Sequence, residues 1–72
     1  MLRMEFTRHA KNRMRLYNVT PADAEAVVAT PAIAHDVKEN PIHAAVIADG
    51  RMIEVVVALN EPSLVITLYE KS

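Results

Sequence analysis

The sequence predicts a single α+β domain over residues 1–72, with two N-terminal helices packed on one face of a three- to four-stranded antiparallel sheet. Two segments come first that begin at capping residues and have the spacing of apolar residues typical of helices. After Pro31 the apolar residues alternate with a period of two. The composition is 51% hydrophobic with one Gly and four Pro, which is typical of a chain that folds. These three observations together favour helices first and a sheet second.

The first helix is predicted over residues 8–17, because Thr7 is a suitable N-cap and no Gly or Pro interrupts the segment. Arg13 lies within the apolar stripe of this helix and His9 lies at the edge of that stripe. Asn18 tolerates the left-handed conformation that often ends a helix. The side chains of the stripe, which should face the core, are Phe6, Ala10, Met14 and Tyr17.

A second helix should begin after Thr20, which can cap it, with Pro21 at the first helical position. Asp23 then favours the positive end of the helix dipole. The helix should end near Ala29, because Pro31 disfavours a helical conformation at the preceding residue.

The rest of the chain reads as strands and turns. Asp49-Gly50 predicts a two-residue hairpin turn, and a further turn is expected over residues 60–63. The predicted strands are Ile33–Val37, His43–Ala48, Arg51–Leu59 and Leu64–Tyr69.

The alternation within the last two strands gives the sheet two unlike faces. Since two short helices cover only one side of a sheet, the mixed face should be either solvated or an interface. The aliphatic face, which should receive the helices, consists of Ile53, Val55, Val57 and Leu59 with Leu64, Ile66 and Leu68. The mixed face combines Val56, Val65 and Tyr69 with Glu54 and Thr67.

Charge is unevenly distributed along the chain. The net charge is −1, yet five of the eight Lys and Arg residues, and only one acidic residue, lie in the first fifteen positions. Such a patch can attract phosphate, although a solvated helix face is the simpler interpretation. There is no Cys, and no apolar run approaches the roughly 20 residues of a membrane span, so we expect a cytoplasmic protein with no membrane partner.

Three segments carry a resemblance to a known family. Residues 9–14 (HAKNRM) resemble the HAxxRM opening of the domain of unknown function 4258 family. Asp49-Gly50-Arg51 leading into residues 53–57 resembles the central hairpin of that family, and residues 65–69 (VITLY) resemble its closing strand. The family is similar to the RelE and BrnT-like toxins of toxin–antitoxin systems, which are compact ribonuclease folds.

The resemblance implies an RNA-cleaving toxin, or a relative that has lost the chemistry, with a protein antitoxin as partner. Tyr17-Asn18 stands where an Arg-Gly pair is common in the family, so one basic group that would grip phosphate is missing.

Metal-independent RNA cleavage needs a base for the 2′-hydroxyl, an acid for the leaving oxygen and a cation on the phosphate. His9 suits either proton transfer near neutral pH, and Arg13, one helical turn later, is placed to hold the same phosphate. The Tyr69 ring offers a surface for base stacking. The predicted catalytic residues are therefore His9, Arg13 and Tyr69, and the predicted RNA-binding residues are Arg8, Arg51 and Thr67.

Each of these residues also has a structural interpretation. Arg13 would pair with Glu54 or with strand carbonyls in the interior, and His9 would hydrogen-bond to a strand edge. Tyr69 and Thr67 would simply pack in a strand, and Arg51 would be an exposed residue after a turn. On this second hypothesis the chain is a non-enzymatic module that forms a homodimer or hetero-complex through the open sheet face.

No cofactor or metal is predicted. The three histidines lie on separate predicted elements without a recognised ligand spacing; they are His9, His35 and His43. The sequence also has no Gly-rich phosphate loop and no Cys nucleophile.

Overall fold

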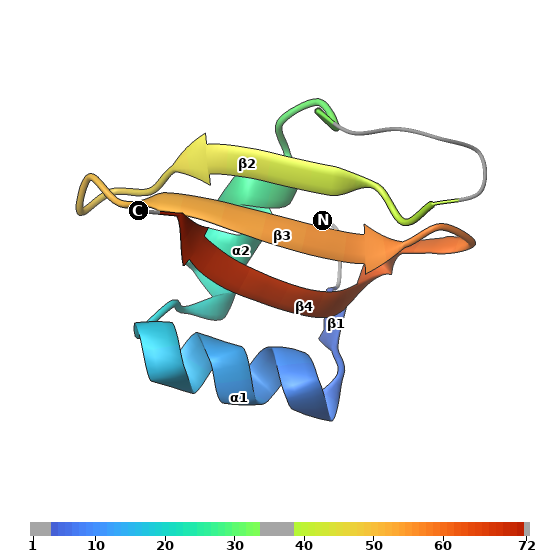
Figure 1. Ribbon diagram of the computed structural model, residues 1–72, viewed down its shortest axis with the longest axis horizontal. Helices are drawn as coiled ribbons and strands as arrows, with labels where there is room; N and C mark the ends of the chain where they lie inside the picture. The colour runs from blue at the N-terminus through green and yellow to red at the C-terminus, as the bar shows by residue number, and fades with distance from the viewer. Residues whose placement is uncertain (1–3, 34–38, 72) are drawn as a thin grey trace.

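The computed structural model describes residues 4–33 and 39–71, which form two helices and a four-stranded sheet (Figure 1). The elements are β1 (Glu5–Phe6), α1 (Arg8–Tyr17), α2 (Pro21–Val28), β2 (Ile42–Val46), β3 (Met52–Ala58) and β4 (Glu61–Lys71). The predicted α+β class is confirmed, as are both helices.

The sheet is mixed rather than purely antiparallel, which corrects the sequence-based prediction. Its strand order is β1-β4-β3-β2, and β1 runs parallel to β4 while the other neighbours are antiparallel. The backbone N–H of Thr7 continues the parallel pairing by donating to the Val65 carbonyl at 3.0 Å. A strand of two residues is too short to produce an alternating pattern, so the sequence gives no sign of β1.

Helix α1 begins and ends where its caps predict. The Thr7 side chain accepts from the Ala10 N–H at 3.0 Å, and Asn18 adopts the left-handed conformation at φ 55 and ψ 50. The Thr7 hydroxyl also donates to the Ile66 carbonyl at 2.6 Å. One residue therefore both starts the helix and fixes that start to β4.

Helix α2 begins with a reciprocal capping box. The Asp23 N–H donates to the Thr20 hydroxyl at 3.1 Å, and the Thr20 N–H donates to the Asp23 carboxylate at 3.2 Å. Pro21 occupies the first turn, and Ala29 is the C-cap, two residues before Pro31. The predicted boundaries of this helix are confirmed.

The hairpin between β2 and β3 has a three-residue loop, not the predicted two-residue turn. Ile47 and Arg51 close the loop through a 2.9 Å hydrogen bond, and the Gly50 N–H donates to the Ile47 carbonyl at 2.9 Å. Gly50 has φ 91, so the loop has the form of a turn followed by a glycine bulge.

Of the predicted strand at residues 33–37, only Ile33 is described, and it lies in a bend rather than a strand. Residues 34–37, which include His35, lie outside the described residues. The predicted turn at residues 60–63 is shorter, because only Leu59 and Asn60 form it and β4 begins at Glu61.

A bulge in β4 moves Val65 to the helix-covered face, which corrects its predicted place on the mixed face. Val56 pairs with Thr67, but Val57 pairs with Val65, so one extra residue lies opposite this step. Val65 is consequently fully buried. A sequence pattern of strict alternation cannot reveal such a shift.

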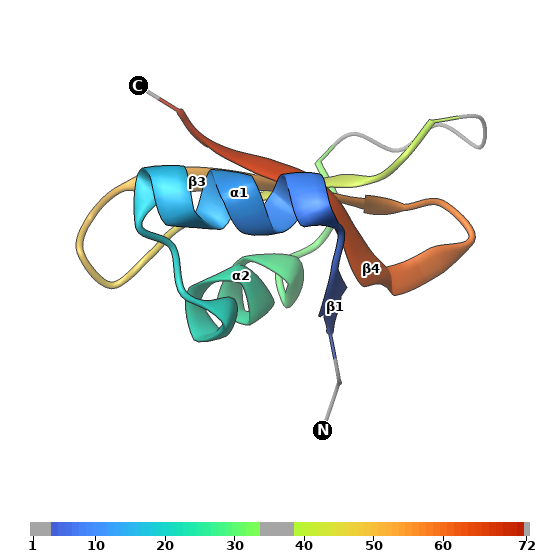
Figure 2. The ribbon, with the colours of Figure 1, turned by 90° about the horizontal axis from the view of Figure 1, so that it is seen from below.

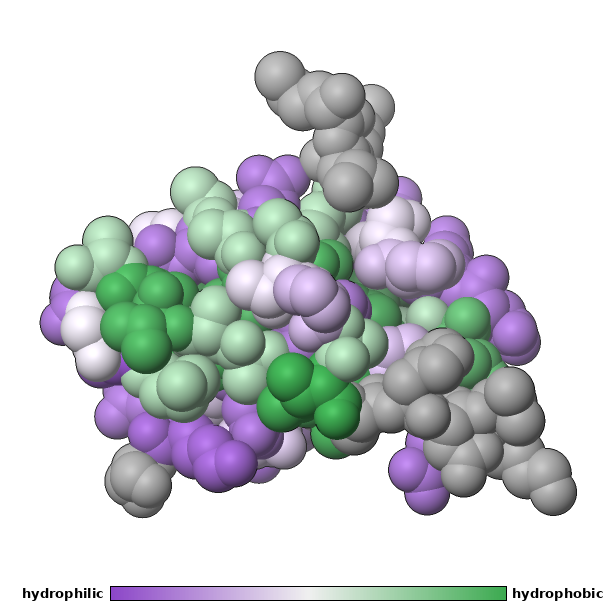
Figure 3. All heavy atoms as spheres, turned by 90° about the horizontal axis from the view of Figure 1, so that it is seen from above, coloured by the Kyte–Doolittle hydropathy of each residue, from purple (hydrophilic) through white to green (hydrophobic). Residues whose placement is uncertain are grey.

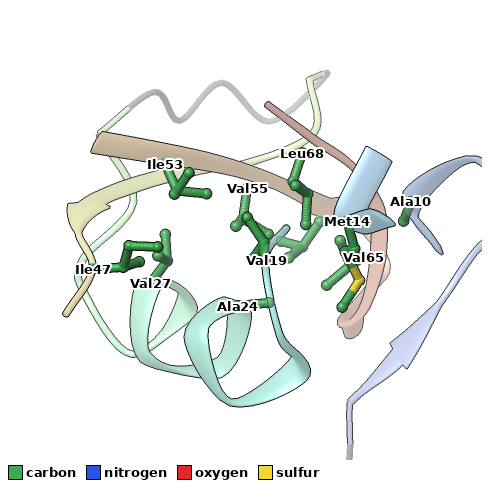
Figure 4. Close-up of a cluster of buried hydrophobic side chains, with 11 residues drawn as sticks. Ala10, Met14, Val19, Ala24, Val27, Ile47, Ile53, Val55, Val65 and Leu68 are labelled. Atoms are coloured by element: carbon green, nitrogen blue, oxygen red, sulfur yellow. The ribbon is translucent and has the colours of Figure 1, made fainter. Parts of the chain in front are cut away.

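The two helices enclose one core beneath the sheet. Helix α1 packs along β4 and α2 packs under β2 and β3 (Figure 2). Seen from the β2 side, apolar residues gather in the middle of the surface and hydrophilic residues surround them (Figure 3). In Figure 4, Ala24 and Val27 of α2 lie opposite strand residues Ile53, Val55 and Leu68. Among the described residues, the buried hydrophobic side chains are Ala10, Met14, Val19, Ala24, Val27, Ile47, Ile53, Val55, Val57, Val65 and Leu68. In the described part of the chain, neither helix has the length and apolarity needed to cross a membrane.

Candidate functional site

The exposed face of α1 is basic. The helix contains no Asp or Glu, and the three cations on this face, Arg8, Lys11 and Arg15, make no ion pair with any described residue. Leu16, at 67% exposure, lies among them. The exposed polar side chains of the helix are Arg8, His9, Lys11, Asn12 and Arg15. Of the five basic residues in the patch predicted from the sequence, Arg8, Lys11 and Arg15 therefore lie on one exposed helix face. Arg13 is half-buried, and Arg3 lies outside the described residues.

His9 is in the first turn of α1, two residues after the Thr7 contacts with β4. Its side chain is exposed, and within the described chain it makes no hydrogen bond to a strand edge. The imidazole is thus accessible to a solute that approaches the start of the helix.

Arg13 is half-buried and lies on the same helix one turn later. Its Nη1 donates to the Tyr17 hydroxyl at 3.2 Å. The proposed structural pairing with Glu54 is not observed, because Glu54 accepts from Lys71 instead. Tyr17 therefore orients the Arg13 guanidinium, while the other N–H groups of Arg13 make no described hydrogen bond.

Arg51 connects the hairpin to the end of α1. Its guanidinium donates to the Tyr17 carbonyl and, at 3.1 Å, to the Asn18 carbonyl. It also pairs with Asp49 at 2.7 Å and with Glu70 at 3.0 Å. The carboxylates of Glu70 and Asp49 raise the pKa of Arg51, and the backbone N–H of Arg51 is the main cause that lowers the pKa of Asp49. Arg51 is thus held by groups of this chain on several sides.

A buried carboxylate lies beside Tyr69 on the sheet face turned away from the core. Glu54 is directly across from Tyr69 in the β3–β4 pairing and is only 7% exposed. Lys71 Nζ donates to Glu54 Oε1 at 3.1 Å. The Tyr69 hydroxyl, and then Lys71, lower the pKa of Glu54, while Glu54 raises the pKa of Tyr69.

The role of Glu54 and Lys71 was missed by reasoning from motifs. The available signal was a single acidic residue within the otherwise apolar strand 52–58. Thr67, half-buried, is paired with Val56 two residues before Tyr69, so Thr67 and Tyr69 lie on the same face as predicted.

The six predicted site residues fall into separate groups, and no hydrogen bond or ion pair in the described structure joins any two of them. Arg8 and His9 begin α1, whereas Arg51 contacts its last turn. A helix of ten residues spans about 15 Å at about 1.5 Å per residue, so Arg51 is remote from His9.

Among residues 4–33 and 39–71, no three His, Asp or Glu side chains form a group that would hold a metal ion. His43 in particular is used structurally, since its Nδ1 lies 2.6 Å from the Thr30 carbonyl.

Comparison with protein families matches residues 6–70 to the domain of unknown function DUF4258, and the chain belongs to that family. No curated protein and no solved structure gives a significant match.

Proposed function

We propose that this domain is a cytoplasmic, RelE/BrnT-like toxin-type ribonuclease that binds RNA through α1 and is controlled by a protein antitoxin. The observation that supports RNA binding is the exposed, acid-free face of α1, with Arg8, Lys11 and Arg15 free of ion pairs to other described residues. Unpaired cations arranged along one helix suit a phosphate backbone.

The position of these cations is unfavourable for the helix itself. Arg8 and Lys11 are near the N-terminus of α1, where the helix dipole is positive and acidic residues would be stabilising. An incoming phosphate group would be attracted by the dipole and the side chains together. This part of the helix therefore favours anion binding over intrinsic stability.

Cleavage would follow the metal-independent route. His9 takes the proton of a 2′-hydroxyl, whose oxygen then attacks the neighbouring phosphorus. The bond from phosphorus to the 5′-oxygen breaks, and that oxygen takes a proton from water or from the imidazolium. The products are a 2′,3′-cyclic phosphate and a 5′-hydroxyl. Arg13 would stabilise the charge that develops on the phosphate oxygens.

Tyr69 fits a positioning role better than a proton-transfer role. Because Glu54 raises the pKa of the Tyr69 hydroxyl, this group gives up its proton less readily than a free tyrosine. The ring remains half-exposed on β4, on the sheet face turned away from the core, and it offers a surface for a base. Thr67 would contact the same nucleotide, whereas Arg51 is left out because it is held at the other end of α1.

The activity test uses single-stranded RNA with excess chelator present, and it follows the appearance of 2′,3′-cyclic phosphate ends. We expect His9→Ala to reduce the cleavage rate by about 100-fold or more and Arg13→Ala to reduce it strongly. Leu16→Ala, an exposed change on the same helix, should cleave like the wild type. Full activity in both His9→Ala and Arg13→Ala would reject the mechanism, and a wild type that leaves RNA intact would reject the ribonuclease itself.

Binding can be tested apart from cleavage. We expect RNA affinity to fall with salt, with a slope of about 0.7 per phosphate contact for a single strand. Replacing Arg8, Lys11 and Arg15 together by Gln should lower that slope by about 2, as measured by fluorescence anisotropy of labelled RNA. An unchanged slope would show that RNA, if bound, uses another surface.

A second candidate function is a non-catalytic interaction module. It is favoured by the sheet face opposite the core, where Met52 is 37% and Val46 60% exposed without a covering helix. On this hypothesis the open face receives a partner protein, and α1 serves the fold. Capture of a defined partner by the wild type that is lost in Met52→Lys, with no RNA cleavage, would support it.

A further inference from the structure

We infer that β2 is the interface for a second copy of this chain. Two β2 strands would pair antiparallel about a two-fold axis at Ala45, which would join two four-stranded sheets into one continuous sheet. The inference does not rest on RNA binding. Helix α1, the proposed RNA-binding element, packs along β4, and β3 lies between β4 and β2 in the sheet.

On its outer side, the backbone of β2 has hydrogen-bonding groups without a partner among residues 4–33 and 39–71. The Pro41 carbonyl accepts from Val57 at 3.1 Å and the Ile47 N–H donates to Arg51 at 2.9 Å, so the odd-numbered residues bond toward β3. In an antiparallel pair the N–H and carbonyl groups of the alternate residues then point away from β3, and here these are residues 42, 44 and 46. The Ile42 carbonyl already accepts from the Ile33 N–H at 2.8 Å. Among the described residues, no backbone partner is found for the N–H groups of Ile42, Ala44 and Val46 or for the carbonyls of Ala44 and Val46.

The edge also lacks three of the features by which monomeric proteins protect such strands, namely charged residues, Pro and a bulge. Edge strands are usually guarded by Lys, other charges, Pro or a bulge. β2 reads IHAAV and contains none of the charged residues and no Pro. Val46 is 60% exposed, and its cross-strand neighbour Met52 is 37% exposed. Apolar side chains accordingly occupy much of the surface seen from this side (Figure 3).

A second copy fits the free part of the strand. With Ala45 on the axis, Ala44 of each copy lies opposite Val46 of the other in a hydrogen-bonded pair. This arrangement satisfies the N–H groups and carbonyls of Ala44 and Val46 in each chain, and it avoids the end of β2 occupied by Ile33. A partner strand running the full length of β2 would have to displace the Ile33 contact.

The surroundings of β2 are also self-complementary. The strand carries no charge that would repel its own copy or select an oppositely charged partner. Helix α2 packs under β2, and Ala26 of the helix and its C-cap Ala29 are exposed and small enough for two helices to approach. A domain of 72 residues has little core of its own, and pairing of copies is a common way to extend it.

Sedimentation velocity over protein concentrations from about 1 μM to about 1 mM tests the proposal. The wild type should show a reversible monomer–dimer equilibrium. Ala44→Pro removes an outward N–H, which an edge strand tolerates, and Val46→Lys places a charge at the interface. Each should weaken dimerisation by about tenfold or more while circular dichroism stays native. Leu16→Lys, at a similarly exposed position on α1, is the matched control and should dimerise normally.

A cross-link tests the register. Residues on the axis form a non-hydrogen-bonded pair with Cα atoms about 4.5 Å apart, which is within the range for a disulfide. The chain has no Cys of its own, so Ala45→Cys should form a covalent dimer on mild oxidation, and Leu16→Cys should not. A wild type that stays monomeric at every concentration, or a dimer unaffected by both β2 variants, would overturn the proposal.

Discussion

Glu54 is a buried charged residue on the sheet face turned away from the core. The residue is 7% exposed, and its carboxylate accepts from Lys71, which is charged and largely exposed. The Tyr69 hydroxyl and Lys71 both lower the pKa of Glu54. These partners outweigh the loss of hydration, because the net effect lowers the pKa of Glu54. The ionised form is therefore the one that the fold stabilises.

The direction of that shift fixes the pH dependence of stability. A carboxyl group whose pKa is lower in the folded than in the unfolded state, where it is about 4.3, stabilises the fold above that value. The contribution is lost as the pH falls through the folded-state pKa. We expect Glu54→Gln to be about 1–2 kcal/mol less stable at neutral pH and to lose less stability on acidification than the wild type.

Urea unfolding followed at several pH values between about 3 and 7 measures this difference. Glu25→Gln, an exposed change on α2, is the control, and its free energy of unfolding should change with pH as that of the wild type does. Parallel stability curves for Glu54→Gln and wild type would show that the Glu54 carboxylate does not contribute.

At the scale of elements, Arg51 explains how α1 is held at its C-terminal end. The last carbonyls of a helix have no partner within it, and the Arg51 guanidinium donates hydrogen bonds to two of them, those of Tyr17 and Asn18. The same fork reaches Asp49 and Glu70, so the hairpin, β4 and α1 meet at one side chain. Thr7 ties the other end of the helix to β4.

We therefore expect Arg51→Ala to lower the melting temperature and to speed amide hydrogen exchange in residues 14–18 of α1. The melting temperature and exchange rates of Arg51→Lys should lie between those of Arg51→Ala and the wild type, because an ammonium keeps the charge but loses the planar fork. Arg15→Ala, exposed on the same helix, should leave both measurements nearly unchanged. Equal effects of Arg51→Ala and Arg15→Ala would mean that Arg51 is not a structural tie.

For the whole molecule, the predictable features were those set by neighbours in the chain. Thr7, Asn18 and the Thr20–Asp23 box define the helix ends through contacts within four residues, so the sequence indicates them directly. Strand β1 and the β4 bulge depend on pairing between residues distant in the chain, which periodicity does not record.

The candidate site shows the same division. The basic face of α1, including His9 and Arg8, follows from helical spacing alone. The contacts of Arg51 with Tyr17 and Asn18 span more than thirty positions, and the Glu54–Lys71 ion pair joins two strands. Neither could be assigned before the chain was folded, because each depends on which elements become neighbours.

The bulge in β4 gives the sharpest test of the fold as a whole. Strict alternation predicts that Ile66 faces the core and Val65 faces away, whereas the structure buries Val65 fully and leaves Ile66 half-exposed. We expect Val65→Ala to cost about 2 kcal/mol through lost burial and a cavity, which lowers the melting temperature by roughly 10 °C in a domain of this size. Ile66→Ala removes more atoms but should cost less, because Ile66 is less buried. Thermal denaturation of the two variants side by side tests this register. A larger drop in melting temperature for Ile66→Ala than for Val65→Ala would indicate a strand without the bulge, with Val65 on the open face, where Tyr69 and Thr67 lie.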